Sequence, residues 1–113
     1  MKESLELIRW EEDGNVYVFT FDDFGRVESY CENECLGIQF LISANILRMI
    51  VKHARKLGAP PPLSLKDLSS SKVKKNLLET GDMAKIKNDF GTTDLKSVAK
   101  ITIKQTYNFI HKL

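Results

Sequence analysis

Hydrophobic residues form short blocks, partly alternating with polar ones, over the first third of the chain. Three stretches rich in Val, Ile, Tyr and Phe predict strands, at residues 4–10, 15–21 and 26–32. Asp13-Gly14 and then 22–25 separate them, and both connections contain typical turn residues. Because such short connections require antiparallel neighbours, we expect a three-stranded antiparallel meander.

The second predicted strand is apolar on both faces. Val16 and Val18 fall on one side, and Tyr17, Phe19 and Phe21 fall on the other. A strand with one face in water would carry polar residues at alternate positions. We therefore expect a central strand covered on both faces, either by the C-terminal helices or by a second subunit, so that a homodimer is one alternative.

A long helix is predicted over residues 34–57. Its apolar residues recur at spacings of three, four or seven: Leu36, Phe40, Leu47, Val51, Ala54 and Leu57. The last two turns are rich in basic residues, which suits the negative end of the helix dipole. Gly58 ends the helix, and the stiff run Pro60-Pro61-Pro62 forms a connection to the rest of the chain.

The second half of the chain predicts short helices. Ser64 and Asp67 have the spacing of a capping box, and the helix that they begin ends at Gly81, with a potential break at 69–71.

Two further helices follow. Asp82 is expected to cap a short one that ends at Gly91, and Thr92 or Thr93 to cap a final helix that reaches the C-terminus. The final helix shows one apolar face, formed by Leu95, Val98, Ala99, Thr102, Thr106, Phe109, Ile110 and Leu113.

The predicted fold class is therefore α+β. An N-terminal three-stranded antiparallel meander packs on one long helix, and a small helical C-terminal region follows. We expect a single domain over 1–113, divided into the meander with its helix (1–58), a proline-rich connection (59–63) and a basic helical region (64–113).

Composition agrees with one ordinary globular domain. The chain has 113 residues, of which 42% are hydrophobic and 28% charged, enough for a hydrophobic core. The first ten residues include several charged ones, whereas a signal peptide requires an apolar run there. The longest uncharged stretch, 35–47, is too short to span a bilayer as a helix. We expect a soluble, cytoplasmic protein without membrane contact.

The sequence CENEC at 31–35 raises the question of a metal or redox site. Cys31, Cys35, His53 and His111 could supply four zinc ligands. However, Cys35 and His53 would lie about 27 Å apart along the predicted helix, whereas ligands of one zinc ion lie within about 4 Å. We interpret CENEC as a strand-to-helix junction with buried thiols, and a redox pair is the alternative.

Other candidates for catalysis are weak. Asp22, Asp23 and Glu28 have no basic or nucleophilic partner nearby in sequence, and Asp is common in turns. Neither His53 nor His111 has the sequence context of a general base, and no phosphate-binding loop or hydrolase motif occurs. We therefore predict a non-enzyme without a cofactor, although a site assembled from distant residues would escape this reasoning.

Charge is distributed unevenly along the chain. Residues 1–47 carry ten acidic and three basic residues, and residues 48–113 carry fourteen basic and five acidic ones. Such asymmetry favours polyanion binding or an acidic partner, and mutual neutralisation of the two halves is the alternative.

A set of lysines is the candidate partner-binding site. Lys96, Lys100 and Lys104 repeat at i, i+4 and form one ridge, and Lys72, Lys74 and Lys75 precede them. The pattern over this region matches a helix-turn-helix at only two of five diagnostic positions. Lys87 occupies a position that must be small, and Ser97 and Lys100 occupy core positions.

These observations predict a non-catalytic regulatory or adaptor protein. Its partner would be nucleic acid or an acidic protein surface, bound through Lys72, Lys74, Lys75, Lys96, Lys100 and Lys104. The first alternative is an assembly protein that homo-oligomerises through apolar sheet surface, and the second is a small enzyme.

Overall fold

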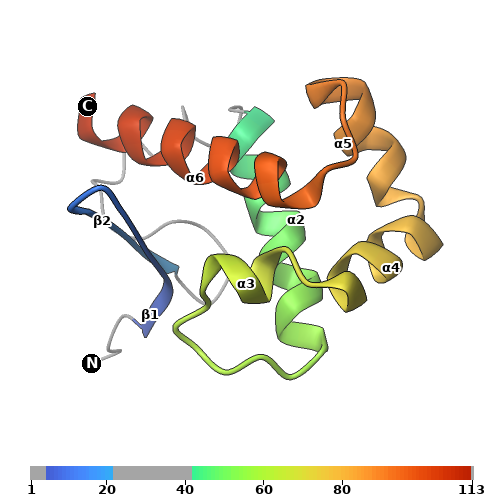
Figure 1. The fold of residues 1–113 in the computed structure, drawn as a ribbon, viewed down its shortest axis with the longest axis horizontal. Coiled ribbons are helices and arrows are strands. Elements are labelled where there is room, and N and C mark those ends of the chain that lie inside the picture. The colour runs from blue at the N-terminus through green and yellow to red at the C-terminus, as the bar shows by residue number, and fades with distance from the viewer. Residues whose placement is uncertain (1–4, 22–41, 113) are drawn as a thin grey trace.

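The fold is α+β over residues 5–21 and 42–112, the two segments that the computed structural model describes (Figure 1). Residues 1–4, 22–41 and 113 lie outside the description. In chain order the elements are β1 (Leu5–Glu12), β2 (Asn15–Phe21), α2 (Ile42–Lys56), α3 (Leu65–Leu68), α4 (Ser71–Thr80), α5 (Asp82–Phe90) and α6 (Leu95–Lys112).

The first two predicted strands are confirmed as an antiparallel hairpin, with Trp10 opposite Tyr17. Asp13 and Gly14 connect them with φ values of 51° and 81°, and positive φ at both central residues is what a type I′ turn requires. Because this tight turn keeps the ladder paired up to its last residues, β1 extends to Glu12, beyond the predicted end of the strand.

The third predicted strand, 26–32, lies outside the described residues, as does the first part of the predicted long helix, 34–41. Within the described segments it is β1, not β2, that has backbone partners on both edges. The Arg9 N–H donates to the Leu63 carbonyl at 3.0 Å, on the edge of β1 opposite β2. The proline-rich connection, which contains a cis Pro61–Pro62 bond, therefore returns to the hairpin and buries Leu63.

Among the described residues, the helices cover one face of the hairpin, whereas the sequence predicted that C-terminal helices or a second subunit cover both faces of β2. Ile8, Trp10 and Phe19 are buried on the inner face. On the outer face the side chain of Val16 is 40% exposed. Coverage of the outer face of β2 by a second subunit stays a prediction.

The described helix with direct ring contacts to the hairpin is α6, whereas the sequence predicted packing on the helix of residues 34–57, whose first part lies outside the described residues. Tyr107 of α6 makes an edge-to-face contact with Tyr17, with ring centroids 4.8 Å apart, and another with Phe19 at 6.2 Å. Edge-to-face pairs of this kind add to the burial of apolar area. At 18 residues α6 is also longer than the 15 residues of α2 that are described.

One hydrophobic core joins the hairpin to the helices. α2 crosses α6 and packs against it (Figure 1). The predicted apolar spacing is confirmed in part. Leu57 is 41% exposed, and Ile103 is buried although the predicted face did not include it. The residues buried between the elements include Ile8, Phe19, Leu47, Ile50, Val51, Ala54, Leu95, Val98, Ala99 and Ile103. The basic helical region therefore packs back on the hairpin.

The predicted start of α3 and the break after it are confirmed. The Asp67 N–H donates to Ser64 Oγ at 3.3 Å, and the Ser64 N–H donates to the Asp67 carboxylate at 2.9 Å, which completes a capping box. Ser70 then accepts from the Val73 N–H at 3.2 Å and caps α4. Because Ser64 caps α3 and Ser70 caps α4, the apolar residues of this stretch belong to two helices instead of one.

Two predicted caps are wrong. Gly81, with φ of 84°, ends α4 and precedes α5, so Asp82 is the first residue of α5 and makes no cap hydrogen bond. α6 begins after Asp94, whose carbonyl accepts from the Val98 N–H, while Thr92 accepts from the Asp94 N–H in the turn before it. The Asp82 carboxylate contacts His53 instead, and the Asp94 side chain accepts from the backbone N–H groups of Lys96 and Ser97, so Asp94 caps α6.

In the described part of the chain, no helix combines the length and the apolar character that crossing a membrane requires.

Candidate functional site

The predicted lysine ridge on α6 is present but is partly neutralised. Lys96 is exposed, and Lys100 and Lys104 follow it at successive turns, away from the buried face of the helix. Lys104 Nζ lies 2.7 Å from one carboxylate oxygen of Glu12, and Lys100 Nζ lies 3.7 Å from the other. A single hairpin carboxylate therefore bridges two of the three ridge lysines.

The bridge changes the titration of both partners. The side-chain hydrogen bond from Lys104 lowers the pKa of Glu12, and the same bond raises the pKa of Lys104. Lys104 Nζ also lies 5.7 Å from the centroid of the Trp10 ring, a cation–π distance. Both ionised groups are thus held in their charged forms at neutral pH.

The α4 lysines lie apart from the α6 ridge, except at one point. Lys72 and Lys75 are exposed, and Lys74 is half-buried. The charge of Lys74 contributes to a lowered pKa of Asp94, just before α6, although the largest cause is the hydrogen bond from the Ser97 hydroxyl. Lys74 therefore brings α4 close to the start of the ridge.

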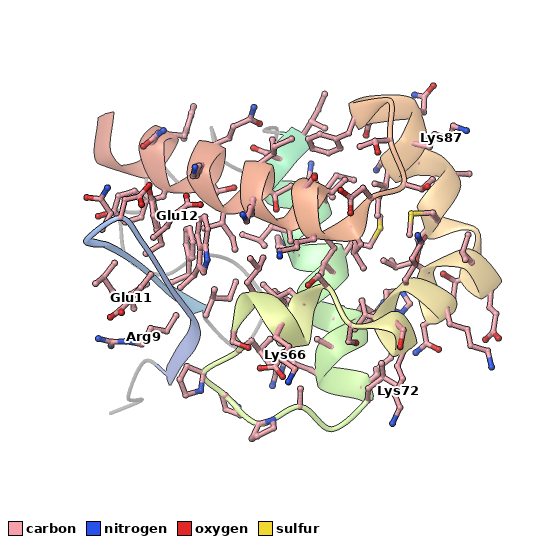
Figure 2. The ribbon with its side chains drawn as sticks, in the orientation of Figure 1. Arg9, Glu11, Glu12, Lys66, Lys72 and Lys87 are labelled. Carbon is pink, nitrogen blue, oxygen red and sulfur yellow. The ribbon has the colours of Figure 1, made fainter. Side chains whose placement is uncertain are left out.

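Four of the six candidate lysines are unpaired within residues 5–21 and 42–112. None of Lys72, Lys74, Lys75 and Lys96 has a carboxylate within 4.0 Å there. Basic side chains also occur elsewhere on the helices, as Figure 2 shows for Lys66 on α3, Lys72 on α4 and Lys87 on α5. The positive charge is consequently spread over several helices, and the α6 ridge is its most regular part.

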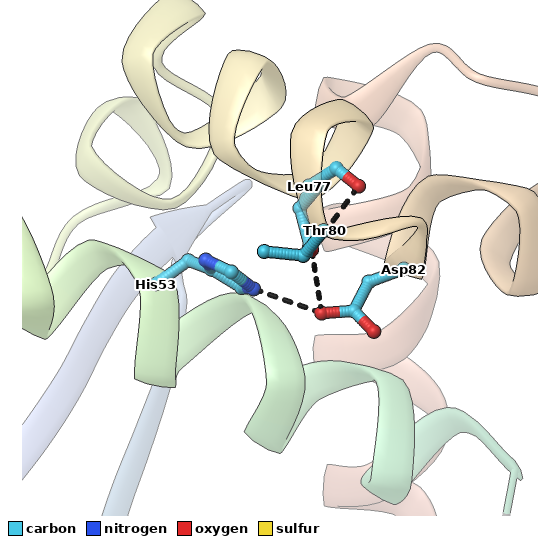
Figure 3. Close-up of polar contacts among 4 residues, drawn as sticks. All are labelled: His53, Leu77, Thr80 and Asp82. Carbon is cyan, nitrogen blue, oxygen red and sulfur yellow. Dashed lines mark hydrogen bonds and ion pairs between the residues drawn. The ribbon is translucent and has the colours of Figure 1, made fainter.

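A buried histidine network was missed by the sequence reasoning. His53 of α2 is 4% exposed, and its Nε2 lies 3.0 Å from Asp82 Oδ2 (Figure 3). The Thr80 hydroxyl donates to the same oxygen at 2.9 Å. His53 was interpreted as one of several basic residues at a helix end. Its spacing of three residues from Ile50 and seven from Ile46 could have identified it as a core position.

The network connects α2 to the turn between α4 and α5. Since the carboxylate accepts, His53 Nε2 carries the proton, and the hydrogen bond from His53 is the largest cause of a lowered pKa of Asp82. His53 Nδ1 is buried and has no hydrogen-bond partner in the described segments. A general base must reach a substrate, and this nitrogen faces the interior, so the geometry supports a structural role.

We expect Asp82→Asn to reduce the free energy of unfolding by about 1 kcal/mol near pH 7, because a charge-assisted hydrogen bond is weakened at a carboxylate that is 38% exposed. The pKa of Asp82 is lower in the folded state than in the unfolded state. The carboxylate therefore contributes fully to the free energy of unfolding at a pH above its unfolded-state pKa of about 3.9, and this contribution is lost as the pH falls through its folded-state pKa. Urea denaturation of the wild type and the variant at several pH values measures this difference.

Asp89→Asn is the matched control for that experiment, because Asp89 is an exposed aspartate of the same helix. It should change stability little at any pH. Equal effects of the two substitutions would contradict a specific contribution of the histidine network.

The metal and redox candidates fall mostly outside the description. Cys31, Cys35, Asp22, Asp23 and Glu28 belong to residues 22–41, and the side chain of His111 is likewise not described. Residues 5–21 and 42–112 contain no cluster of three or more metal-binding side chains.

Comparison with known proteins gives no match: no family model fits the chain, and no curated protein or solved structure is significantly similar to it.

Proposed function

We propose that the protein is a non-catalytic regulatory or adaptor protein that binds an anionic macromolecule, either nucleic acid or an acidic protein surface. The contact is made by the α6 ridge, Lys96, Lys100 and Lys104, together with Lys72, Lys74 and Lys75 of α4. The observation that supports this proposal is the excess of fourteen basic over five acidic residues in 48–113. Within residues 5–21 and 42–112, four of the six candidate lysines have no carboxylate within 4.0 Å.

The chemistry of lysine favours contact with a chain of charges rather than with one base or side chain. Its ammonium group is a hydrated point charge on a flexible stem and lacks the planar fork with which arginine recognises a single phosphate or carboxylate. Each neutralised phosphate releases condensed counterions, so several lysines can bind weakly and without sequence preference. This favours an adaptor with a broad choice of partner over a sequence reader.

The aromatic cluster of Trp10, Tyr17 and Tyr107, within the described part of the chain, does not favour a single-stranded nucleic acid. Trp10 and Tyr17 stack on each other with ring centroids 5.1 Å apart, and Tyr17 also contacts Tyr107. Their faces are thus engaged within the protein, whereas recognition of single strands needs aromatic faces on which bases can stack. A duplex or an acidic polypeptide suits the ridge better.

A second candidate is an assembly protein that homo-oligomerises through the sheet. Val16, on the outer face of β2, is 40% exposed and could contribute to a subunit contact. Such association should resist salt, because the burial of apolar area is not screened as surface charge is.

Light scattering with a mixed-sequence duplex, and separately with polyglutamate, distinguishes these functions. We expect a complex at about 50 mM salt that dissociates as salt rises, with a slope of log K against log salt of about −3.6 to −5.4 for four to six phosphate contacts. Binding of the duplex alone selects nucleic acid, and binding of polyglutamate alone selects an acidic protein. A salt-resistant oligomer that binds neither probe would contradict the proposal and support the assembly protein.

A further inference from the structure

The hairpin presents its two glutamates in opposite directions. Glu11 and Glu12 are consecutive residues at the end of β1, and successive side chains of a strand point to opposite faces. Glu12 shares the inner face with Trp10 and lies beside α6, whereas Glu11 points away from the helices, as Figure 2 shows. Two equal charges one residue apart therefore have different surroundings.

Glu12 occupies the place on the ridge that an anionic partner would use. Its two oxygens lie 2.7 Å from Lys104 and 3.7 Å from Lys100, so each ammonium already has a negative partner in the free protein. Only Lys96 of the three ridge lysines has no carboxylate within 4.0 Å among the described residues. A phosphate or carboxylate that approaches Lys100 or Lys104 also meets the repulsion of Glu12.

The position of Glu12 does not depend on the ion pairs. The hairpin is held against α6 by the packing of Tyr17 and Phe19 on Tyr107, and by Trp10, which is buried. Exposed ion pairs contribute little to stability, whereas buried aromatic side chains contribute much more. The carboxylate is thus kept at the ridge at a high effective concentration, as a ligand tethered to its own binding site.

We infer that Glu12 is an intramolecular competitor that attenuates binding at Lys100 and Lys104, so that the ridge selects partners with closely spaced negative charges. This inference rests on the proposed function, because it describes the regulation of the same site. A partner with one isolated charge gains little by replacing Glu12. A partner with several adjacent charges contacts Lys96 and the α4 lysines as well, and can displace it.

The test compares wild type, Glu12→Gln and Glu11→Gln in binding to the mixed-sequence duplex over a range of salt concentrations. Glu12→Gln should raise the affinity about two- to fivefold more than Glu11→Gln at low salt, the effect expected for replacing an exposed ion pair. The slope of log K against log salt should change by less than about one, because the duplex displaces Glu12 from both lysines in the wild type and makes the same phosphate contacts in the two proteins. Glu11→Gln controls for the loss of one negative charge from the same hairpin.

A second measurement needs no partner. Acylation of Lys104 by an amine-reactive reagent, followed by peptide mass spectrometry, should be faster in Glu12→Gln than in Glu11→Gln, because Glu12 raises the pKa of Lys104 in the wild type. Equal acylation in the two variants would show that the pairing does not occur in solution and would overturn the inference.

The remaining outcomes separate the inference from the proposed function. If the wild type binds and the two variants bind equally well, the competitor role is wrong while the binding function stands. If no variant binds the duplex or polyglutamate under any condition, the proposed function fails and the inference fails with it. Circular dichroism of each variant establishes that the comparison is made between folded proteins.

Discussion

The double substitution Lys96→Glu with Lys100→Glu is expected to abolish measurable binding of the duplex, with a loss of roughly two orders of magnitude in affinity at about 50 mM salt. Each substitution removes one cation from the α6 ridge and places a negative charge where a phosphate would approach. The slope of log K against log salt should also fall by about two, one for each lost contact. Fluorescence anisotropy of a labelled duplex measures both quantities.

Lys85→Glu with Lys87→Glu is the matched control, because both lysines are exposed on α5 and the change in net charge is identical. This variant should keep a substantial part of the affinity, reduced only by the weaker overall field. Equal losses in the two double variants would contradict a localised contact on α6. Since Lys100 pairs with Glu12, thermal unfolding should be compared as well, to exclude loss of folded protein.

Phe19→Ala is expected to lower the free energy of unfolding by about 3–5 kcal/mol, a large part of the stability of a domain of this size. Phe19 is fully buried in the core between the hairpin and the helices, and it contacts Tyr107 of α6. Its removal leaves a cavity at the contact that joins β2 to α6. Denaturation by urea, followed by tryptophan fluorescence and by circular dichroism, measures the loss.

The same experiment examines whether the chain behaves as one domain. Trp10 reports on the hairpin, and circular dichroism reports chiefly on the helices, so coincident transitions are expected from one shared core. Val16→Ala, on the exposed face of the same strand, should change stability by only about 0.5 kcal/mol. Separate transitions, or a small effect of Phe19→Ala, would show that the hairpin and the helices fold independently.

Local sequence signals predicted the parts of the fold that depend on nearby residues. Asp13-Gly14 specified the hairpin because its backbone conformation restricts the residues that fit. Ser64 and Asp67 specified the start of α3 for the same reason, since the two hydrogen bonds of the capping box lie within one helical turn. Such signals contain all of their interacting partners in a few consecutive residues.

The parts that could not be predicted depend on residues far apart in sequence. Asp82 was interpreted as a helix cap, but its carboxylate contacts His53, which is distant along the chain and close only after α2 and α5 have packed. The pairing of Glu12 with Lys104 has the same origin, because it requires the hairpin to dock on α6. Charge asymmetry and lysine spacing identified the ridge, but they do not show which acidic residue of the first half of the chain lies next to which lysine.

The return of the chain to β1 has a consequence for association between molecules. An exposed strand edge offers unpaired N–H and carbonyl groups that can template another strand and so start aggregation. Here the carbonyl of Leu63 already accepts from the Arg9 N–H on the edge of β1 opposite β2. The residues just before Leu63 are prolines, which have no N–H to extend the ladder. Residues 60–63 therefore cover this edge of β1, and their three prolines offer no N–H group with which a strand of another molecule could pair.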